Sequence, residues 1–189
     1  MSGKFEIFVT GITTLLTLTP KPSEIDLLPV CGVLLENLIA TDDWLPDSHA
    51  VSNPDTYCQY LLYRDPEARF SVVSFVWGLG QESPIHDHRV WGAIGMLRGS
   101  ETGTAFNRDD DTGKLTEGNS VTLEPGMVDF VSPRLGDIHR VRNADDEQAS
   151  ISIHVYGADI GAIERRLYDP ETGEPSPFVS GYTPLAPTG

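Results

Sequence analysis

The chain has 189 residues, which is enough for one medium-sized domain with a core of its own. Its 28 acidic and 13 basic residues give a formal net charge of −15. Nucleic acids and anionic membranes are bound by clustered Lys and Arg, so this balance argues against both as partners. No apolar run reaches the ~18 residues of a membrane-spanning helix, and no membrane span is expected.

The N-terminus carries Lys4 and Glu6 and lacks a small-residue cleavage site, so the sequence predicts no signal peptide and a reducing, cytoplasmic location. Cys31 and Cys58 are too few for a disulfide framework and are expected to be reduced thiols buried as small apolar side chains. The sequence makes no prediction of the oligomeric state.

Residues 1–45 have the pattern of helices. Apolar residues recur at helical spacing from Phe5 to Leu16, which predicts an amphipathic helix. Ser23 can cap a second helix with an apolar face at Leu27, Leu34 and Leu38.

From residue 57 onward the pattern changes to short apolar or alternating runs separated by Gly, Pro, Asn and Asp, which is typical of an antiparallel β-sandwich or barrel. We therefore expect a single, mainly β domain over residues 1–189 with a β core at 57–165. The Pro-rich tail at 166–189 is expected to be extended. The runs expected to form strands are 57–63, 70–77, 90–97, 121–124, 127–132 and 150–157.

His86 and His88 are candidate metal ligands. On a strand, two residues separated by one point to the same face, so both imidazoles can bind one ion. His139 is the best candidate for the third ligand. Together with Gly80 and Gly99, the two histidines fit the first sequence motif of the cupin superfamily, a jelly-roll barrel with a metal in its mouth, and residues 133–143 resemble the second motif.

The cupin motif normally supplies a Glu ligand, and Gly92 stands at that position, followed by Ala93. Three neutral histidines without a carboxylate leave a divalent ion its full charge. Such a site favours an anionic ligand from outside the protein, a thiolate above all.

Ser152, His154 and Tyr156 alternate with Ile151, Ile153 and Val155 in the run SISIHVY. A period of two places the three polar groups on one face of a strand. If that face lines the barrel, the three side chains can form a hydrogen-bond relay that ends in a phenol near the metal.

Three segments together resemble the thiol dioxygenases of the cysteine dioxygenase family, most closely their bacterial 3-mercaptopropionate dioxygenase branch, over roughly residues 41–182. These segments are SVVSFVWGLGQESPIHDHRVWGAIGMLRG, GDIHRVRN and SISIHVYGADIGAIERR. The resemblance implies a cupin barrel with helices packed on it and non-haem Fe(II) held by His86, His88 and His139. It also implies that Ser152, His154 and Tyr156 form the outer relay.

The resemblance also implies which residues bind substrate. Arg165 matches the Arg with which the mercaptopropionate branch holds the substrate carboxylate, and Arg166 is the alternative. Gln59 is the nearest match to an early-strand Arg of mammalian-type enzymes. Those enzymes crosslink a Cys to the relay Tyr, and Gly92-Ala93 at the matching place excludes that crosslink.

The expected function is addition of both atoms of O2 to the sulfur of a small carboxylate-bearing thiol, with 3-mercaptopropionate favoured and cysteine or mercaptosuccinate as alternatives. Two other classes stay open at this point. One is a non-oxygenase cupin with Zn, Ni or Mn, and the other is a metal-stabilised binding or sensor barrel without turnover.

Overall fold

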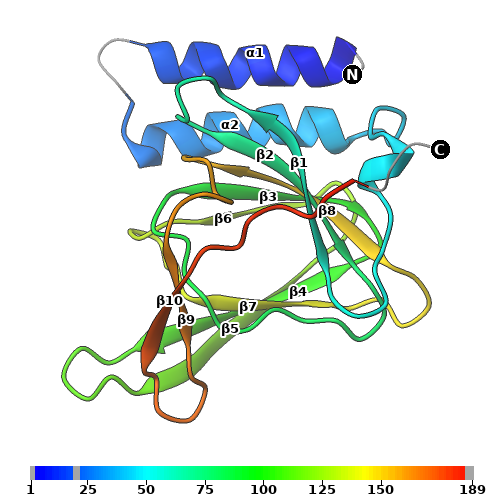
Figure 1. Cartoon of the computed structure of the whole chain (residues 1–189). Helices are drawn as coiled ribbons and strands as arrows, with labels where there is room; N and C mark the ends of the chain where they lie inside the picture. Colours follow the sequence, from blue (N-terminus) through cyan, green and yellow to red (C-terminus); the bar gives the residue numbers. More distant parts are fainter. Residues whose placement is uncertain (1–2, 19–21, 186–189) are drawn as a thin grey trace.

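A computed structural model describes residues 3–18 and 22–185. Two helices precede a series of ten strands (Figure 1). The helical elements are α1 (Gly3–Thr17), α2 (Glu24–Ile39) and the short 3-10 helix η1 (Asp47–His49). The strands are β1 (Cys58–Arg64), β2 (Ser71–Trp77), β3 (Gly92–Arg98), β4 (Glu101–Arg108), β5 (Leu115–Leu123), β6 (Val128–Val131), β7 (His139–Asn143), β8 (Ser150–Tyr156), β9 (Arg165–Tyr168) and β10 (Pro175–Phe178).

The strands form two opposing sheets with a hairpin at one end. A five-stranded sheet in the order β1-β2-β8-β3-β6 lies between the helices and the barrel interior, and a three-stranded sheet in the order β5-β4-β7 lies opposite (Figure 1). The paired strands within each sheet are antiparallel. This mainly β barrel with helices packed on it confirms the expected fold class.

Alternation along the central strands divides the core into two layers. On β8, Ile151, Ile153 and Val155 pack with the helices, whereas Tyr156 belongs to the apolar cluster inside the barrel. Every residue of β8 is buried because the helices cover the outer face of the sheet. The sheet can therefore present polar side chains to the interior while its other face is sealed by α2.

The helices approach the sheet closely where both sides have glycine. A Cβ atom at Gly95 of β3 would lie 2.8 Å from Leu35 of α2, and one at Gly32 of α2 would lie 2.6 Å from Phe130 of β6.

Neither α1 nor α2, the long helices of the described residues, has the length and apolar composition of a membrane-spanning segment. Cys31 and Cys58 are free and buried, as expected.

Three details differ from the expectations. The tail after residue 165 contains the β9–β10 hairpin and is not uniformly extended, because the turn between them lets Arg165–Tyr168 pair with Pro175–Phe178. His86 and His88 lie outside the named strands, in the connection from β2 to β3, where His86 forms isolated bridges to His139 and Leu167. Ser23 precedes α2, but its hydroxyl donates to the Asp26 carboxylate at 2.7 Å and caps no backbone N–H.

Candidate active site

The structure brings His86, His88 and His139 together. Their ligand atoms lie within 4.8 Å of one another, and their ring centroids are 4.7–4.9 Å apart. Two backbone hydrogen bonds, each 3.0 Å long, join His86 and His139 and hold the loop against β7. Three imidazoles at this spacing can hold one divalent ion.

The environment leaves one nitrogen of His86 and of His88 available to a metal. The Nδ1 atom of His86 donates to the carbonyl of Pro84 at 3.0 Å, and that of His88 donates to the Asp137 carboxylate at 3.0 Å. Nε2 of His88 is buried without a partner among the described residues. A buried nitrogen with a free lone pair, held by a carboxylate on its other side, is the usual arrangement of a metal-binding histidine, so these residues fit a metal ion.

The protonation of the group suits metal binding as well. Burial, with the neighbouring charge of His88, lowers the pKa of His86 to about 3, and burial also holds the pKa of His139 well below its usual value. Both imidazoles are therefore neutral at pH 7. Burial favours a higher pKa for Asp137, but hydrogen bonds from His88 and the Arg89 backbone outweigh it, so this carboxyl stays ionised and orients His88.

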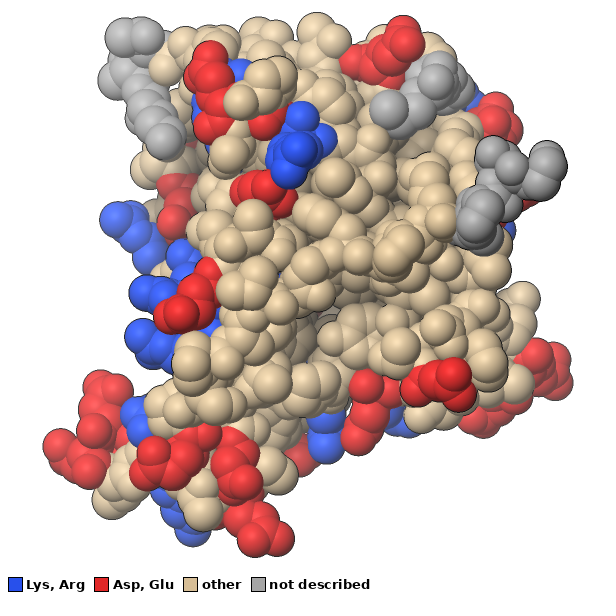
Figure 2. Space-filling view, in the orientation of Figure 1, with Lys and Arg blue, Asp and Glu red and all other residues tan. Residues whose placement is uncertain are grey.

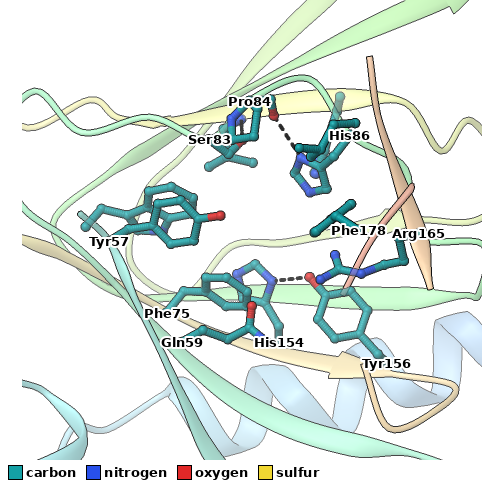
Figure 3. A pocket seen from close by; sticks show the side chains of 14 residues that line it. Tyr57, Gln59, Phe75, Ser83, Pro84, His86, His154, Tyr156, Arg165 and Phe178 are labelled. Atoms are coloured by element: carbon teal, nitrogen blue, oxygen red, sulfur yellow. Dashed lines mark hydrogen bonds between the residues drawn. The ribbon is translucent and has the colours of Figure 1, made fainter. Parts of the chain in front are cut away.

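Ser152, His154 and Tyr156 form a continuous row of hydrogen bonds on the interior face of β8. Ser152 Oγ and His154 Nε2 are 2.7 Å apart. His154 Nδ1 and Tyr156 Oη are also 2.7 Å apart, and Figure 3 shows this second hydrogen bond. Burial keeps the pKa of His154 well below and the pKa of Tyr156 well above their usual values. The row therefore ends in a neutral phenol, whose ring stacks on His88 with centroids 5.3 Å apart.

The Tyr156 ring packs against Gly92, where there is no room for a side chain. A Cβ atom at Gly92 would lie 2.8 Å from that ring and 2.9 Å from Val131. Any larger residue at position 92, including the Glu of the usual cupin motif, would push the ring aside. The position of the Tyr156 ring therefore requires the glycine that stands where that carboxylate ligand would be.

Arg165 enters the same pocket from β9. It is 3% exposed, and its one hydrogen bond to a side chain within residues 3–18 and 22–185, from Nη2 to Ser180 Oγ, is 2.7 Å long. Its guanidinium lies over the Phe178 ring at 4.6 Å, and its Nε is buried without a partner among the described residues. Burial lowers its pKa, but a guanidinium keeps its charge at pH 7. A buried cation with free donors and no acidic partner is a site for an anion.

Gln59 and Arg166 have different surroundings. The Gln59 amide donates to Ser180 Oγ at 3.2 Å and to the Gly181 carbonyl at 3.0 Å, so Ser180 connects it to Arg165. The Arg166 side chain is half exposed on the opposite side of β9, 4.0 Å from Asp87. Of the two neighbouring arginines, Arg165 is therefore the one that faces the histidines.

The pocket that joins these groups is small, with a cavity volume of about 20 Å³. Aromatic side chains, among them Tyr57 and Phe75, form one wall (Figure 3). The Tyr57 and Trp77 rings stack with centroids 4.4 Å apart. Figure 2 shows a hollow on this face of the molecule, bordered mainly by uncharged residues. The pocket is lined by Tyr57, Gln59, Phe75, Trp77, Ser83, Pro84, His86, His139, Val141, His154, Tyr156, Arg165, Leu167 and Phe178, none of which is acidic.

Two polar residues of the site were not predicted from the sequence. Asp137 stands two residues before His139, and the alternation used for the other groups could have assigned it to the same side. Ser180 carries no such signal, because it reaches the site through the fold of the tail.

Comparisons with known proteins agree with this geometry. A sequence profile of the family "Cysteine dioxygenase type I" matches residues 36–168. Cysteine dioxygenase type 1 from Danio rerio is 28% identical over 116 residues, covering 59% of this chain and 56% of that protein. The Rattus norvegicus protein of the same name is 25% identical over 107 residues, covering 56% and 52%. The chain thus spans about half the length of the curated relatives it matches.

Among solved structures, an uncharacterised protein from Klebsiella pneumoniae with a double-stranded β-helix domain aligns with a TM-score of 0.48 and 15% identity, covering 64% of this chain and 95% of that one. The sequence profile spans the three histidines, the relay on β8 and Arg165. By that match, the chain belongs to the cysteine dioxygenase type I family.

Proposed function

We propose that this protein is an Fe(II)-dependent thiol dioxygenase that converts 3-mercaptopropionate to its sulfinate. The observation that carries the proposal is the position of three grouped histidines, two of which (His86 and His139) are neutral and line the pocket, beside the buried cation of Arg165, with which no acidic side chain of the described residues pairs. A small thiol with a carboxylate at its other end satisfies both, its sulfur at the histidines and its carboxylate at the guanidinium.

Fe(II) held by His86, His88 and His139 would supply a site for the thiolate and for O2 and the electrons that activate oxygen. The remaining roles belong to the chain. Arg165 binds the carboxylate, and Gln59 and Ser180 fix its position. Tyr156, held by His154 and Ser152, directs a hydroxyl towards the reacting atoms, and the aromatic wall excludes water.

The charges of the pocket support the choice of substrate. Arg165 is the one Lys or Arg among its lining residues, which include no Asp or Glu. The ammonium of cysteine would find no acidic partner there and would be repelled by the guanidinium. The second carboxylate of mercaptosuccinate would find no second cation, because Arg166 points away. A thiol with one carboxylate and no amine fits best.

Oxygen consumption by protein loaded anaerobically with Fe(II) tests the proposal. We would compare 3-mercaptopropionate, cysteine and mercaptosuccinate at equal concentration and identify the product by mass. We expect the highest kcat/KM with 3-mercaptopropionate and a gain of two oxygen atoms. A preference for another thiol would keep the reaction and overturn the substrate. No uptake with any thiol, from protein shown to hold iron, would favour a non-oxygenase cupin.

A further inference from the structure

Glu101 is a buried carboxyl that the proposed mechanism does not use. It is the first residue of β4 and is 1% exposed, and no Lys or Arg of the described residues pairs with it. Ser150 donates to its Oε1 at 3.2 Å, while its Oε2 is buried without a partner among the described residues. Burying a carboxyl in this way favours its neutral form, in which one oxygen becomes a hydrogen-bond donor.

The fold places this carboxyl at the far end of the relay. The turn between β3 and β4 brings Gly99, with φ of 69°, against the first residue of β8, and a Cβ atom there would lie 3.1 Å from Ser150 Cα. Glu101 follows two residues later. Hydrogen bonds from the Ser152 and Ser150 hydroxyls favour the ionised form of the carboxyl, and the effect of Ser152 on its pKa is the larger. Ser152 is also the first member of the row that ends at Tyr156.

Few polar side chains of the described residues lie around the free oxygen of Glu101. Opposite it on the adjoining strands are Leu123 and Asn143, and a cavity of about 20 Å³ separates it from Asp129 of β6 and His139 of β7. Asp129 accepts a hydrogen bond from the backbone N–H of Phe130. Among the described residues the Ser152 hydroxyl is therefore the available partner of Oε2.

We propose that Glu101 is a fourth member of the relay: in its neutral form it donates a hydrogen bond from Oε2 to Ser152 and thereby sets the direction of the hydrogen bonds as far as Tyr156. Ser152 then donates to Nε2 of His154, and Nδ1–H of His154 donates to the Tyr156 oxygen. The Tyr156 hydroxyl hydrogen is left to point into the pocket. Glu101 is a positioning residue, and its effect on turnover rests on the proposed function.

Ionisation of Glu101 reverses the direction of the hydrogen bonds along the row. An ionised Glu101 accepts from Ser152, so Nε2–H of His154 donates to Ser152 and Nδ1 accepts from Tyr156. The phenol then donates its hydrogen to His154 and has none to donate into the pocket. Burial raises the pKa of Glu101 to about 8. At pH 7 the carboxyl is therefore mostly neutral and the Tyr156 hydroxyl hydrogen points into the pocket. In alkaline solution the carboxyl ionises and the hydrogen bonds of the row reverse.

The tautomer of His154 tests this directly, without metal or substrate. In metal-free protein with ¹⁵N-labelled histidine, we expect Nδ1–H for His154 at about pH 6 and Nε2–H at about pH 10. Glu101→Gln keeps a donor and cannot ionise, so it should show Nδ1–H at both values. Infrared difference spectra should show a protonated carboxyl that titrates near pH 8 in the wild type and is absent from Glu101→Gln. An unchanged tautomer in the wild type, or no such carboxyl, would overturn the proposal.

Kinetics add a second test that uses three variants. Glu101→Met removes the donor at similar volume and should lower kcat about tenfold while KM for the carboxylate thiol changes less than about twofold, because Arg165 is untouched. Glu101→Gln should restore kcat and remove its alkaline decline. Ser150→Ala, which removes a hydrogen bond to the same carboxyl outside the row, is the matched control and should leave kcat within about twofold.

The outcomes separate the two proposals. If the wild-type protein oxidises no thiol, the proposed function fails, and the tautomer and infrared measurements still decide the role of Glu101. If the wild type is active and both Glu101 variants match it in kcat and pH profile, the role of Glu101 fails alone. Should Glu101→Met not fold, the comparison of the wild type with Glu101→Gln carries the same decision.

Discussion

Arg165 carries its charge in a buried place, and no acidic side chain of the described part of the chain forms an ion pair with it. Most arginines of this chain lie at the surface or beside an aspartate, as Arg69 does 2.7 Å from Asp65. The cost of burying an unpaired guanidinium is recovered when an anionic ligand arrives, so the residue stabilises the complex more than the free protein. The binding energy of the substrate carboxylate is therefore expected to depend on this one side chain.

Arg165→Ala should raise KM for 3-mercaptopropionate more than tenfold, because a desolvated, charge-assisted pair contributes about 1.5–3 kcal/mol. A thiol without a carboxylate should be turned over equally well by the variant and the wild type. The matched control is Arg166→Ala, whose side chain is half exposed beside Asp87. Steady-state oxygen uptake measures all three proteins. An unchanged KM in Arg165→Ala, or an equal rise in Arg166→Ala, would remove Arg165 from the substrate site.

Asp137 acts on the metal through His88. Asp137→Asn removes the negative charge that accepts from His88 Nδ1 at 3.0 Å, so the imidazole becomes a weaker ligand. We expect the Kd for Fe(II) to rise by about 10–100-fold. A competition titration with a chelating dye measures it. Asp110→Asn is the control, since Asp110 lines the same surface pocket as Asp137 and, among the described residues, forms no hydrogen bond with a histidine. Equal Kd values in both variants would show that the hydrogen bond does not tune the metal.

At the level of elements, periodicity predicted the strands that lie between two covered faces. The alternation of SISIHVY assigns Ser152, His154 and Tyr156 to one face of β8, and the structure has them there. It did not predict β4 and β7, because Thr, Asn and Arg stand among their residues and leave no apolar run. Nor could it show that the tail brings Ser180 to Arg165, because a contact across 15 residues depends on the turn between β9 and β10.

His86 and His88 are close together, as the sequence predicts, but the structural reason differs from the predicted one. Alternation on a strand was expected to turn His86 and His88 to one side. In the structure they lie in a loop, and the backbone bridge from His86 to His139 holds the loop in this orientation. Their shared direction survives because a short extended loop tied by backbone hydrogen bonds has nearly the side-chain geometry of a strand. Asp87 between them points the other way and accepts from the Tyr168 hydroxyl at 3.0 Å.

The contact between α2 and the five-stranded sheet depends on Gly95. Gly95→Ala should lower the free energy of unfolding by about 1–3 kcal/mol, because the added methyl group would lie 2.8 Å from Leu35 and must displace α2. Gly103→Ala in β4 is the matched control, since nothing lies within 4 Å of a Cβ there. Urea titrations compare the two. Equal stability of both variants would mean that the helix shifts without cost.

At the level of the whole molecule, the site collects side chains from the β2–β3 loop, β7, β8 and β9. Elements from both sheets and from the hairpin therefore meet at one point (Figure 1). The pKa values of His86, His139 and His154 in the folded chain lie below the usual value, so these residues are neutral at pH 7 and their protonation opposes folding. The stability of the metal-free protein should consequently depend on pH through these residues.

The sign follows from the pKa of His86, about 3 in the folded chain against about 6.5 when unfolded. Between these values the unfolded chain binds more protons, so the free energy of unfolding should fall as the pH drops from about 6.5 towards 3. Glu101, whose folded pKa is about 8, has the opposite sign: its contribution declines as the pH rises from about 4.5 to 8. Urea titrations of metal-free wild type and His86→Gln isolate the histidine contribution, because Glu101 is common to both. The variant should lose less stability than the wild type between pH 6.5 and 4, and an equal loss in the two proteins would show that His86 is not buried neutral.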